Sequence, residues 1–212
     1  MRGLYAAETA LFGEGSDALA TTEGARRCEY LTSALTLSLD AAEEVRADWS
    51  GPSRDTFVAG MDGAPQDTVN QLVNEVTNRV RELDEKGLRD LAAADSVSDL
   101  AESRIDGPAA FALAGRRSLL EGIALVIGRD EEGLVALVTA RSPETAERLQ
   151  SATADAVAAL DALPDAVAES FDRPEDVQTA ADAVAELRVV LSTEAASQLG
   201  VTISFSDSDG DS

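Results

Sequence analysis

The stretch PEDVQTAADAVAELRVVLSTEAASQLG, residues 174–200, decides the fold class. Its proline and the two acidic residues that follow are typical of a first helical turn, where an amide is not needed and negative charge meets the positive end of the helix dipole. Gly200 suits the position just after a helix ends. Between these signals, apolar residues recur every three or four positions, at Val177, Ala181, Val184, Leu187, Leu191, Ala195 and Leu199. The spacing predicts one long amphipathic helix packed against a core.

The same periodicity recurs upstream. It predicts a helix over 21–49, with a stripe made of Cys28, Leu31, Leu35, Ala42, Val45 and Trp49. A second stripe follows Pro65 and comprises Val69, Leu72, Val73, Val76, Val80 and Leu83; we expect Gly87 to weaken or end that helix. Further helices are predicted from Gly107-Pro108 to Gly128 and from Ser142-Pro143 onward, the latter kinked or divided at Pro164.

The short apolar run 134–138 is β-branched enough for a strand, but a helix fits its surroundings better. About six helices joined by short connections predict an all-α, up-and-down bundle. We expect two portions, 1–106 and 107–212, the second ending in a polar tail. An apolar stripe at Leu4, Ala7 and Leu11 begins with the chain itself, which suggests that packing partners of this helix lie upstream of Met1.

Composition excludes several classes of function. Seventeen basic residues against 40 acidic ones give a formal charge of −23, which argues against nucleic acid as a partner and against docking on anionic lipid. No apolar run reaches the length of a membrane span, and we expect no transmembrane segment. The chain has no histidine and one cysteine, Cys28, so it has no Ser-His-Asp or Cys-His catalysis and no zinc site with an imidazole ligand.

The opening segment GLYAAETALFG, residues 3–13, contains the candidate site. Tyr5 and Glu8 are three residues apart and therefore share one face of the predicted helix. A carboxylate on a mostly apolar helix is costly to bury without a partner. From spacing alone, the plainest interpretation is a partly exposed glutamate beside a core tyrosine.

This segment resembles the signature of the imelysin-like family, Gly-x-His-x-x-Glu followed by an apolar pair. Gly3 and Glu8 match the signature, and Tyr5 stands where the family has histidine. The resemblance continues along the chain through residues 25–31, 72–74, 84–88, 102–104, 120–123, 198–205 and 209–211. It implies an all-helical protein of two related bundles at the cell envelope or in the periplasm, linked to iron, with a metal or ligand site around the motif. Family members are usually longer, so we expect this chain to lack their opening helices.

The tyrosine at position 5 changes what the resemblance implies for chemistry. A phenol binds metal well only as phenolate, which at neutral pH requires a strong Lewis acid such as ferric iron. A water-activating metal also needs about three protein ligands and an open position. We therefore expect no peptidase activity, although the family carries that label.

Two hypotheses remain for the motif itself. Tyr5, Glu8 and Asp106 converge on iron or another hard cation, or Glu8 forms a structural ion pair with Arg27 or Arg104 in a degenerate site. The expected function is a binding or scaffold protein at the envelope, whose partner or small ligand the sequence does not name. The alternatives are a metal-dependent peptidase and a purely structural interaction module.

Overall fold

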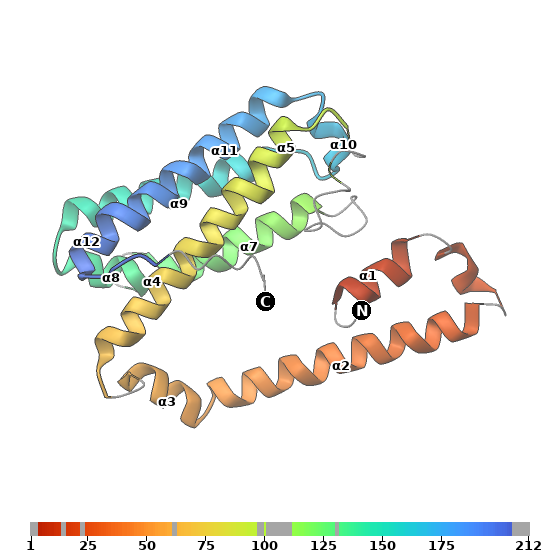
Figure 1. Cartoon of the computed structure of the whole chain (residues 1–212), viewed down its shortest axis with the longest axis horizontal. Coiled ribbons are helices and arrows are strands. Elements are labelled where there is room, and N and C mark those ends of the chain that lie inside the picture. The colour runs from red at the N-terminus through yellow and green to blue at the C-terminus, as the bar shows by residue number, and fades with distance from the viewer. Residues whose placement is uncertain are drawn as a thin grey trace.

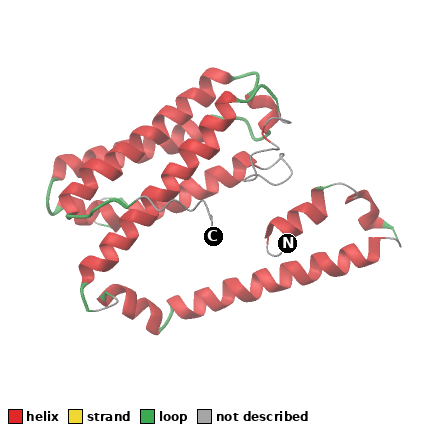
Figure 2. Cartoon of the chain, viewed as in Figure 1, coloured by secondary structure: helices red, strands yellow, loops and turns green. Residues whose placement is uncertain are grey.

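The computed structural model describes residues 4–13, 16–21, 24–60, 63–96, 100, 112–129 and 132–204. Throughout these residues the chain is helical and no strand occurs, which confirms the all-α prediction (Figure 2). Among the same residues, no helix combines the length and the apolar character needed to cross a lipid bilayer.

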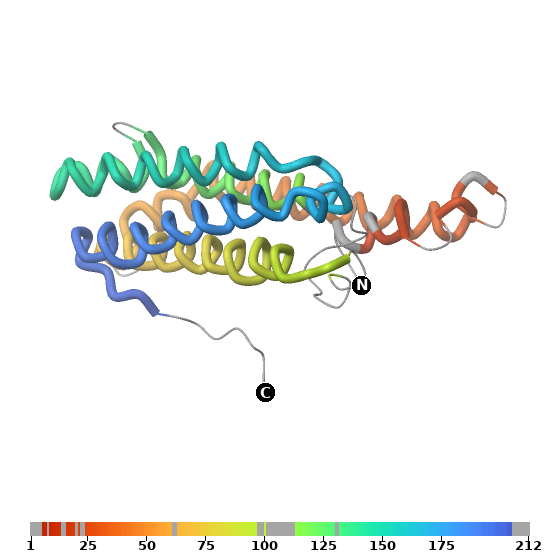
Figure 3. Tube along the Cα trace, turned by 90° about the horizontal axis from the view of Figure 1, so that it is seen from above, coloured from red at the N-terminus to blue at the C-terminus, as the bar shows by residue number. Residues whose placement is uncertain are grey.

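Four rods form the bundle, which we define as the described residues from 65 to 204 (Figure 1 and, from above, Figure 3). The first rod runs from α4 (Pro65–Glu82) through a π-helical turn (Leu83–Arg89) into α5 (Asp90–Ala93). The second is α7 (Ala112–Ile127), joined by α8 (Gly133–Thr139) to the third, α9 (Pro143–Asp161). After α10 (Val167–Ser170), the fourth runs from α11 (Pro174–Val189) through another π-helical turn (Val190–Ala195) into α12 (Ala196–Leu199).

One hydrophobic core joins these rods. Its members extend from Val73 to Val201, and the largest fully buried side chains include Leu88, Leu113, Leu120, Leu149 and Leu187. Helices α9 and α11 share the most extensive packing. The predicted stripe of α4 is buried at Val73, Val76 and Val80. The boundary predicted between residues 106 and 107 lies outside the described residues.

Several predicted helix ends are confirmed. The amide of Thr145 donates to Ser142 Oγ at 3.3 Å at the start of α9, and α9 ends before Pro164. Gly200 has the left-handed φ of 66° that suits a residue following a helix. The ambiguous run 134–138 is helical, as α8.

Of the two outcomes predicted for Gly87, the end of the helix does not occur. The rod passes through it as a π-helical turn and continues to Ala93. A Cβ at Gly87 would lie 3.2 Å from Leu83 Cδ1 and 3.6 Å from Arg116 Nε. The glycine is therefore buried where a larger residue would press on Leu83, and packing compensates for its poor helix propensity.

The chain before residue 61 forms a separate arm, defined as the described residues from 4 to 60. It consists of α1 (Leu4–Phe12), a short 3₁₀ helix (Ser16–Ala20), α2 (Ala25–Trp49) and α3 (Pro52–Ala59). Helix α2 packs chiefly on the other arm elements, and the chain reaches the bundle through α3 and α4 (Figure 1). With 25 residues, α2 is about 37 Å long.

The predicted core stripe of α2 is not buried, which corrects the sequence interpretation. Ala34 is the one buried residue of this helix. Leu35, Val45 and Trp49 are 43%, 57% and 49% exposed. The nine residues of α1 contact the N-terminal part of α2, and α3 contacts its C-terminal end, where the rings of Trp49 and Phe57 pack edge to face. The middle of α2 stays exposed.

Candidate functional site

The motif lies mainly on α1. The structure describes some of the predicted site residues only in part and others not at all. Gly3, Arg104 and Asp106 lie outside the described residues. Tyr5 and Glu8 lie within α1, but the structure describes only their backbone. The convergence of Tyr5, Glu8 and Asp106, and the ion pairs of Glu8 with Arg27 or Arg104, therefore stay predictions.

Small residues seat α1 on α2. Ala6, Ala7 and Ala10 are all buried, and α1 makes its principal contacts with α2. Alanines on one helix face let two helix backbones approach closely.

Arg27 fastens the far end of α1. Its Nε donates to the carbonyl of Ala10 at 3.1 Å, and its second guanidinium nitrogen donates to the carbonyl of Thr9 at 3.2 Å. The last carbonyls of a helix have no partner within the helix and carry partial negative charge, so a guanidinium stabilises them twice over. Arg27 thus lies one helical turn from the motif and acts on the backbone of α1.

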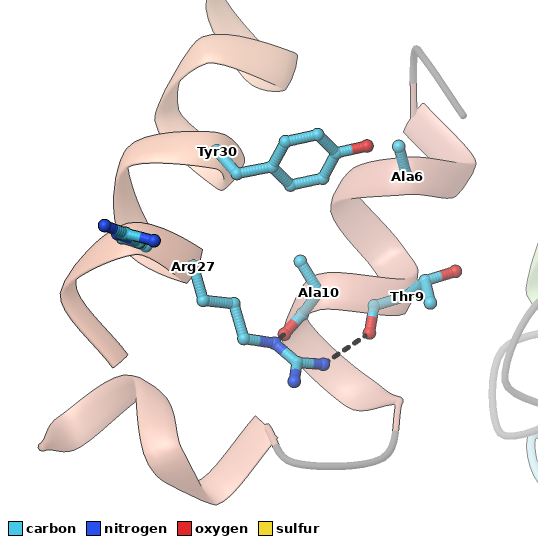
Figure 4. Close-up of a pocket in the computed structure, with 6 residues that line it drawn as sticks. Ala6, Thr9, Ala10, Arg27 and Tyr30 are labelled. Atoms are coloured by element: carbon cyan, nitrogen blue, oxygen red, sulfur yellow. Dashed lines mark hydrogen bonds between the residues drawn. The ribbon is translucent and has the colours of Figure 1, made fainter. Parts of the chain in front are cut away.

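A pocket of about 360 Å³ opens between α1 and α2 beside this contact (Figure 4). Ala6 and Ala10 supply a small apolar floor, and the ring of Tyr30 extends over Ala6. Arg26 and Arg27 supply positive charge at the rim. Guanidinium groups donate several hydrogen bonds in a fixed plane and pair with carboxylates and phosphates. The lining of the pocket therefore combines apolar side chains with two cations, one of which, Arg27, already donates to backbone carbonyls.

Arg26 and Tyr30 are site residues that sequence reasoning missed. They are four residues apart, which places them on one face of α2. The spacing indicates that Arg26 and Tyr30 share a face of α2. It does not indicate that they line a pocket, because that depends on which face of α2 packs against α1. The apolar stripe of α2 gave no indication of that choice.

Among the described residues, no group of three or more His, Cys, Asp or Glu lies close enough together to hold a metal ion. Cys28 is half-buried, and its thiol contacts the carbonyl of Leu19 at 3.5 Å. The side chains of the predicted hard-cation site, Tyr5, Glu8 and Asp106, are not among those described, so that site stays a prediction.

A second polar cluster lies inside the bundle. Asp84 sits in the π-helical turn after α4 and is 0% exposed. Arg89 Nε is 2.8 Å from its Oδ1, and a guanidinium nitrogen of Arg188 is 3.3 Å from its Oδ2. Arg188 also contacts Glu85 at 2.7 Å. These ion pairs tie α11 to the first rod, although Oδ2 of Asp84 lies only within ion-pair distance of Arg188 and makes no hydrogen bond. We assign the cluster a structural role.

Comparison with known families adds one finding. A family model described as imelysin, one of the M75 peptidases, matches residues 1–193. The same comparisons find no matching curated protein and no matching solved structure.

Proposed function

The chain belongs to the imelysin family, and from that premise we propose that it is a binding protein of the cell envelope without peptidase activity. Its arm carries the binding surface, and the group it recognises is acidic. The envelope location rests on family membership.

One observation carries the proposal: the pocket beside the motif helix is rimmed by Arg26 and Arg27. The chain as a whole has a charge of −23, so a pocket lined by two arginines and a tyrosine is a local exception to the negative charge of the protein. The apolar floor removes part of a bound group from water, which strengthens each charged contact.

The chemistry of the motif supports the absence of peptidase activity. Metal-dependent hydrolysis uses about three protein ligands, and histidine is the commonest of them. This chain has no histidine at all, and tyrosine stands at position 5. We propose that this protein takes part in iron-linked physiology, as its family does, but holds no iron ion itself.

The purified protein, incubated with casein and short peptides in the presence of added zinc, is expected to release no fragments. Peptide release that disappears in Glu8→Ala would overturn the proposal in favour of the metal-dependent peptidase. A control reaction with a chelator identifies cleavage by a contaminating protease that needs no metal.

Binding is tested with a fluorescently labelled tetraglutamate peptide, followed by anisotropy at low ionic strength. We expect Arg26→Ala to weaken binding several-fold, because one of the two rim cations is lost. Arg141→Ala removes an exposed arginine of the bundle and serves as the matched control. Equal affinity in the two variants would show that the pocket is not the binding site.

A further inference from the structure

The chain that follows α12 runs along α4 and is held there by amide side chains. Gln66 Nε2 donates to the carbonyl of Leu199 at 3.0 Å. Further along α4, Asn74 Nδ2 donates to the carbonyl of Thr202 at 3.1 Å, and Asn74 Oδ1 accepts the amide of Ser204 at 2.8 Å. The segment therefore runs in the same direction as α4. An amide side chain offers one donor group and one acceptor, as a residue of a neighbouring strand does.

The side chains of this segment alternate between the core and the solvent. Val201 is 9% exposed and Ile203 packs against the core of the bundle, whereas Thr202 and Ser204 are exposed. Such a period of two is the pattern of an extended backbone with one buried face. The sequence continues in the same phase, with an apolar and then a polar residue at positions 205–206, which lie outside the described residues.

The side chains of α4 that face the segment belong to a row that continues one turn further. The row, which we call the amide row, consists of Gln66, Asn70, Asn74 and Asn78, and residues four positions apart on a helix lie one above the other. Gln66 also donates to Asn70 Oδ1 at 3.1 Å. Asn78 Oδ1 is buried and has no hydrogen-bond partner among the described residues. A buried acceptor without a partner costs free energy, so this end of the row is suited to a further donor.

The spacing of the amide row matches the spacing of an extended chain. Four helical residues rise about 6 Å, and two extended residues advance about 6.6 Å. The carbonyl of Ser204 and the amide of Ser206 therefore reach Asn78 as the carbonyl of Thr202 and the amide of Ser204 reach Asn74. Between its two contacts with α4 the segment already follows this row.

We propose that the amide row is a docking surface for an extended chain, and that residues 205–206 of this chain occupy its last position. The amide of Ser206 donates to Asn78 Oδ1, and the ring of Phe205 lies on the same side as Val201 and Ile203. The inference does not depend on the proposed function, because no residue of the arm takes part in it.

The docked stretch ends at Ser206 for an electrostatic reason. The next position on the same face of α4 is Glu82, whose carboxylate pairs with Arg79 at 3.0 Å. A carboxylate has no hydrogen to donate to a backbone carbonyl, and the residue after Ser206 is Asp207. Like charges at this point repel each other. We therefore expect residues 207–212 to contribute nothing to docking.

The first test measures amide hydrogen exchange by NMR on the full-length protein. We expect the amide of Ser206 to be protected, and its protection to fall about five- to tenfold in Asn78→Ala, because one hydrogen bond is lost. The amide of Ser204 keeps most of its protection. Gln71→Ala removes an exposed amide side chain from the same helix and serves as the matched control. Exchange of Ser206 as fast as in an unstructured peptide, or equal protection with and without Asn78, would overturn the proposal.

The second test removes the donor and leaves α4 unchanged. Ser206→Pro lacks the backbone amide, and its fixed φ suits an extended chain, so the bundle stays folded. We expect the side-chain amide resonances of Asn78 to shift and the amide of Ser204 to exchange faster. Ser208→Pro makes the same change beyond the docked stretch and is expected to alter neither. Equal effects of the two prolines would show that docking does not end at Ser206.

The third test identifies the source of the docked segment. We expect the protection of Ser206 to be the same at low and at high protein concentration, because the segment and the amide row belong to one chain. Protection that falls on dilution, together with a fall in molecular mass by analytical ultracentrifugation, would overturn docking within the chain and assign the amide row to the C-terminal segment of a second copy.

Discussion

Helix α2 of the arm and helix α4 of the bundle both carry an apolar stripe, but apolar and polar side chains are segregated much more sharply in α4, and the two stripes differ in what covers them. In α4, 18 residues bury Val73, Val76, Thr77 and Val80 beneath the other rods. In α2, 25 residues bury Ala34 alone. The comparison shows that periodicity identifies an apolar face and says nothing about whether another part of the same chain covers it.

The largest expected effect is a cavity in the bundle. Leu187 is fully buried in α11, so Leu187→Ala is expected to lower the free energy of unfolding by about 2–5 kcal/mol. The matched arm variant Leu35→Ala removes a side chain that already contacts water, and we expect less than about 0.5 kcal/mol. Urea unfolding followed by circular dichroism measures both. Similar losses would show that Leu35 is buried in solution.

The buried carboxylate of the bundle gives the next largest effect. Asp84→Ala leaves Arg89 without its partner and Arg188 with Glu85 alone, but both arginines are partly exposed and can be solvated, so we expect a loss of about 2–3 kcal/mol. Glu75→Ala breaks a surface pair with Arg79 and is expected to cost less than about 1 kcal/mol. Thermal unfolding of the two variants measures the difference. Equal costs would mean that the π-helical turn opens to water.

A smaller effect is expected from two arginines, one in each region, that both donate hydrogen bonds to backbone carbonyls near the end of a helix. Arg117 donates to the carbonyl of Leu160 in the last turn of α9 and to those of Leu163 and Pro164 beyond its end. Arg27 donates to two carbonyls at the end of α1. We expect Arg117→Ala to destabilise the bundle by about 1–3 kcal/mol, because carbonyls bonded to a charged donor lose it.

For Arg27→Ala, we expect faster amide hydrogen exchange confined to α1, with the bundle unchanged, because the arm opens locally. Hydrogen exchange read by mass spectrometry resolves the two regions. Faster exchange in α9 or α11 of the Arg27→Ala variant would contradict the independence of arm and bundle.

The smallest expected effect concerns metal. An ion bound specifically by the native state raises the thermal midpoint. We expect millimolar calcium and micromolar ferric ion to leave the midpoint and the tyrosine absorbance unchanged, because the described residues offer no fitting donor set. A rise in the midpoint that is lost in both Tyr5→Phe and Glu8→Gln would instead establish a hard-cation site at the motif.

The sequence predicted the bundle well because its helices contain their own boundaries. Pro174 and Gly200 delimit the last rod, and Ser142 caps α9. These signals are local, so they can be recognised without knowledge of the neighbouring helices.

What the sequence could not predict depends on packing between elements. Gly87 lies within its rod, where the chain passes through a π-helical turn and the position packs closely against Leu83, a contact that no local sequence signal reveals. Asp84 is buried because a π-helical turn changes the side-chain register midway along a rod. In the candidate site, Arg27 was identified by resemblance, whereas its bonds to backbone carbonyls and the contribution of Arg26 to a pocket required the relative placement of α1 and α2.

A small change in the turn between α3 and α4 would produce a large displacement at the far end of the arm. Gly60 has a φ of 85°, and a Cβ there would lie 2.2 Å from the carbonyl oxygen of Ala64, so this backbone geometry is restricted to glycine. A rotation of about 10° at this turn would sweep the distant end of a helix about 37 Å long through about 6 Å. The backbone at Gly60 therefore influences the orientation of the whole arm. A bulkier side chain at position 60 would change the orientation of the proposed binding surface on the arm without altering any residue of that surface.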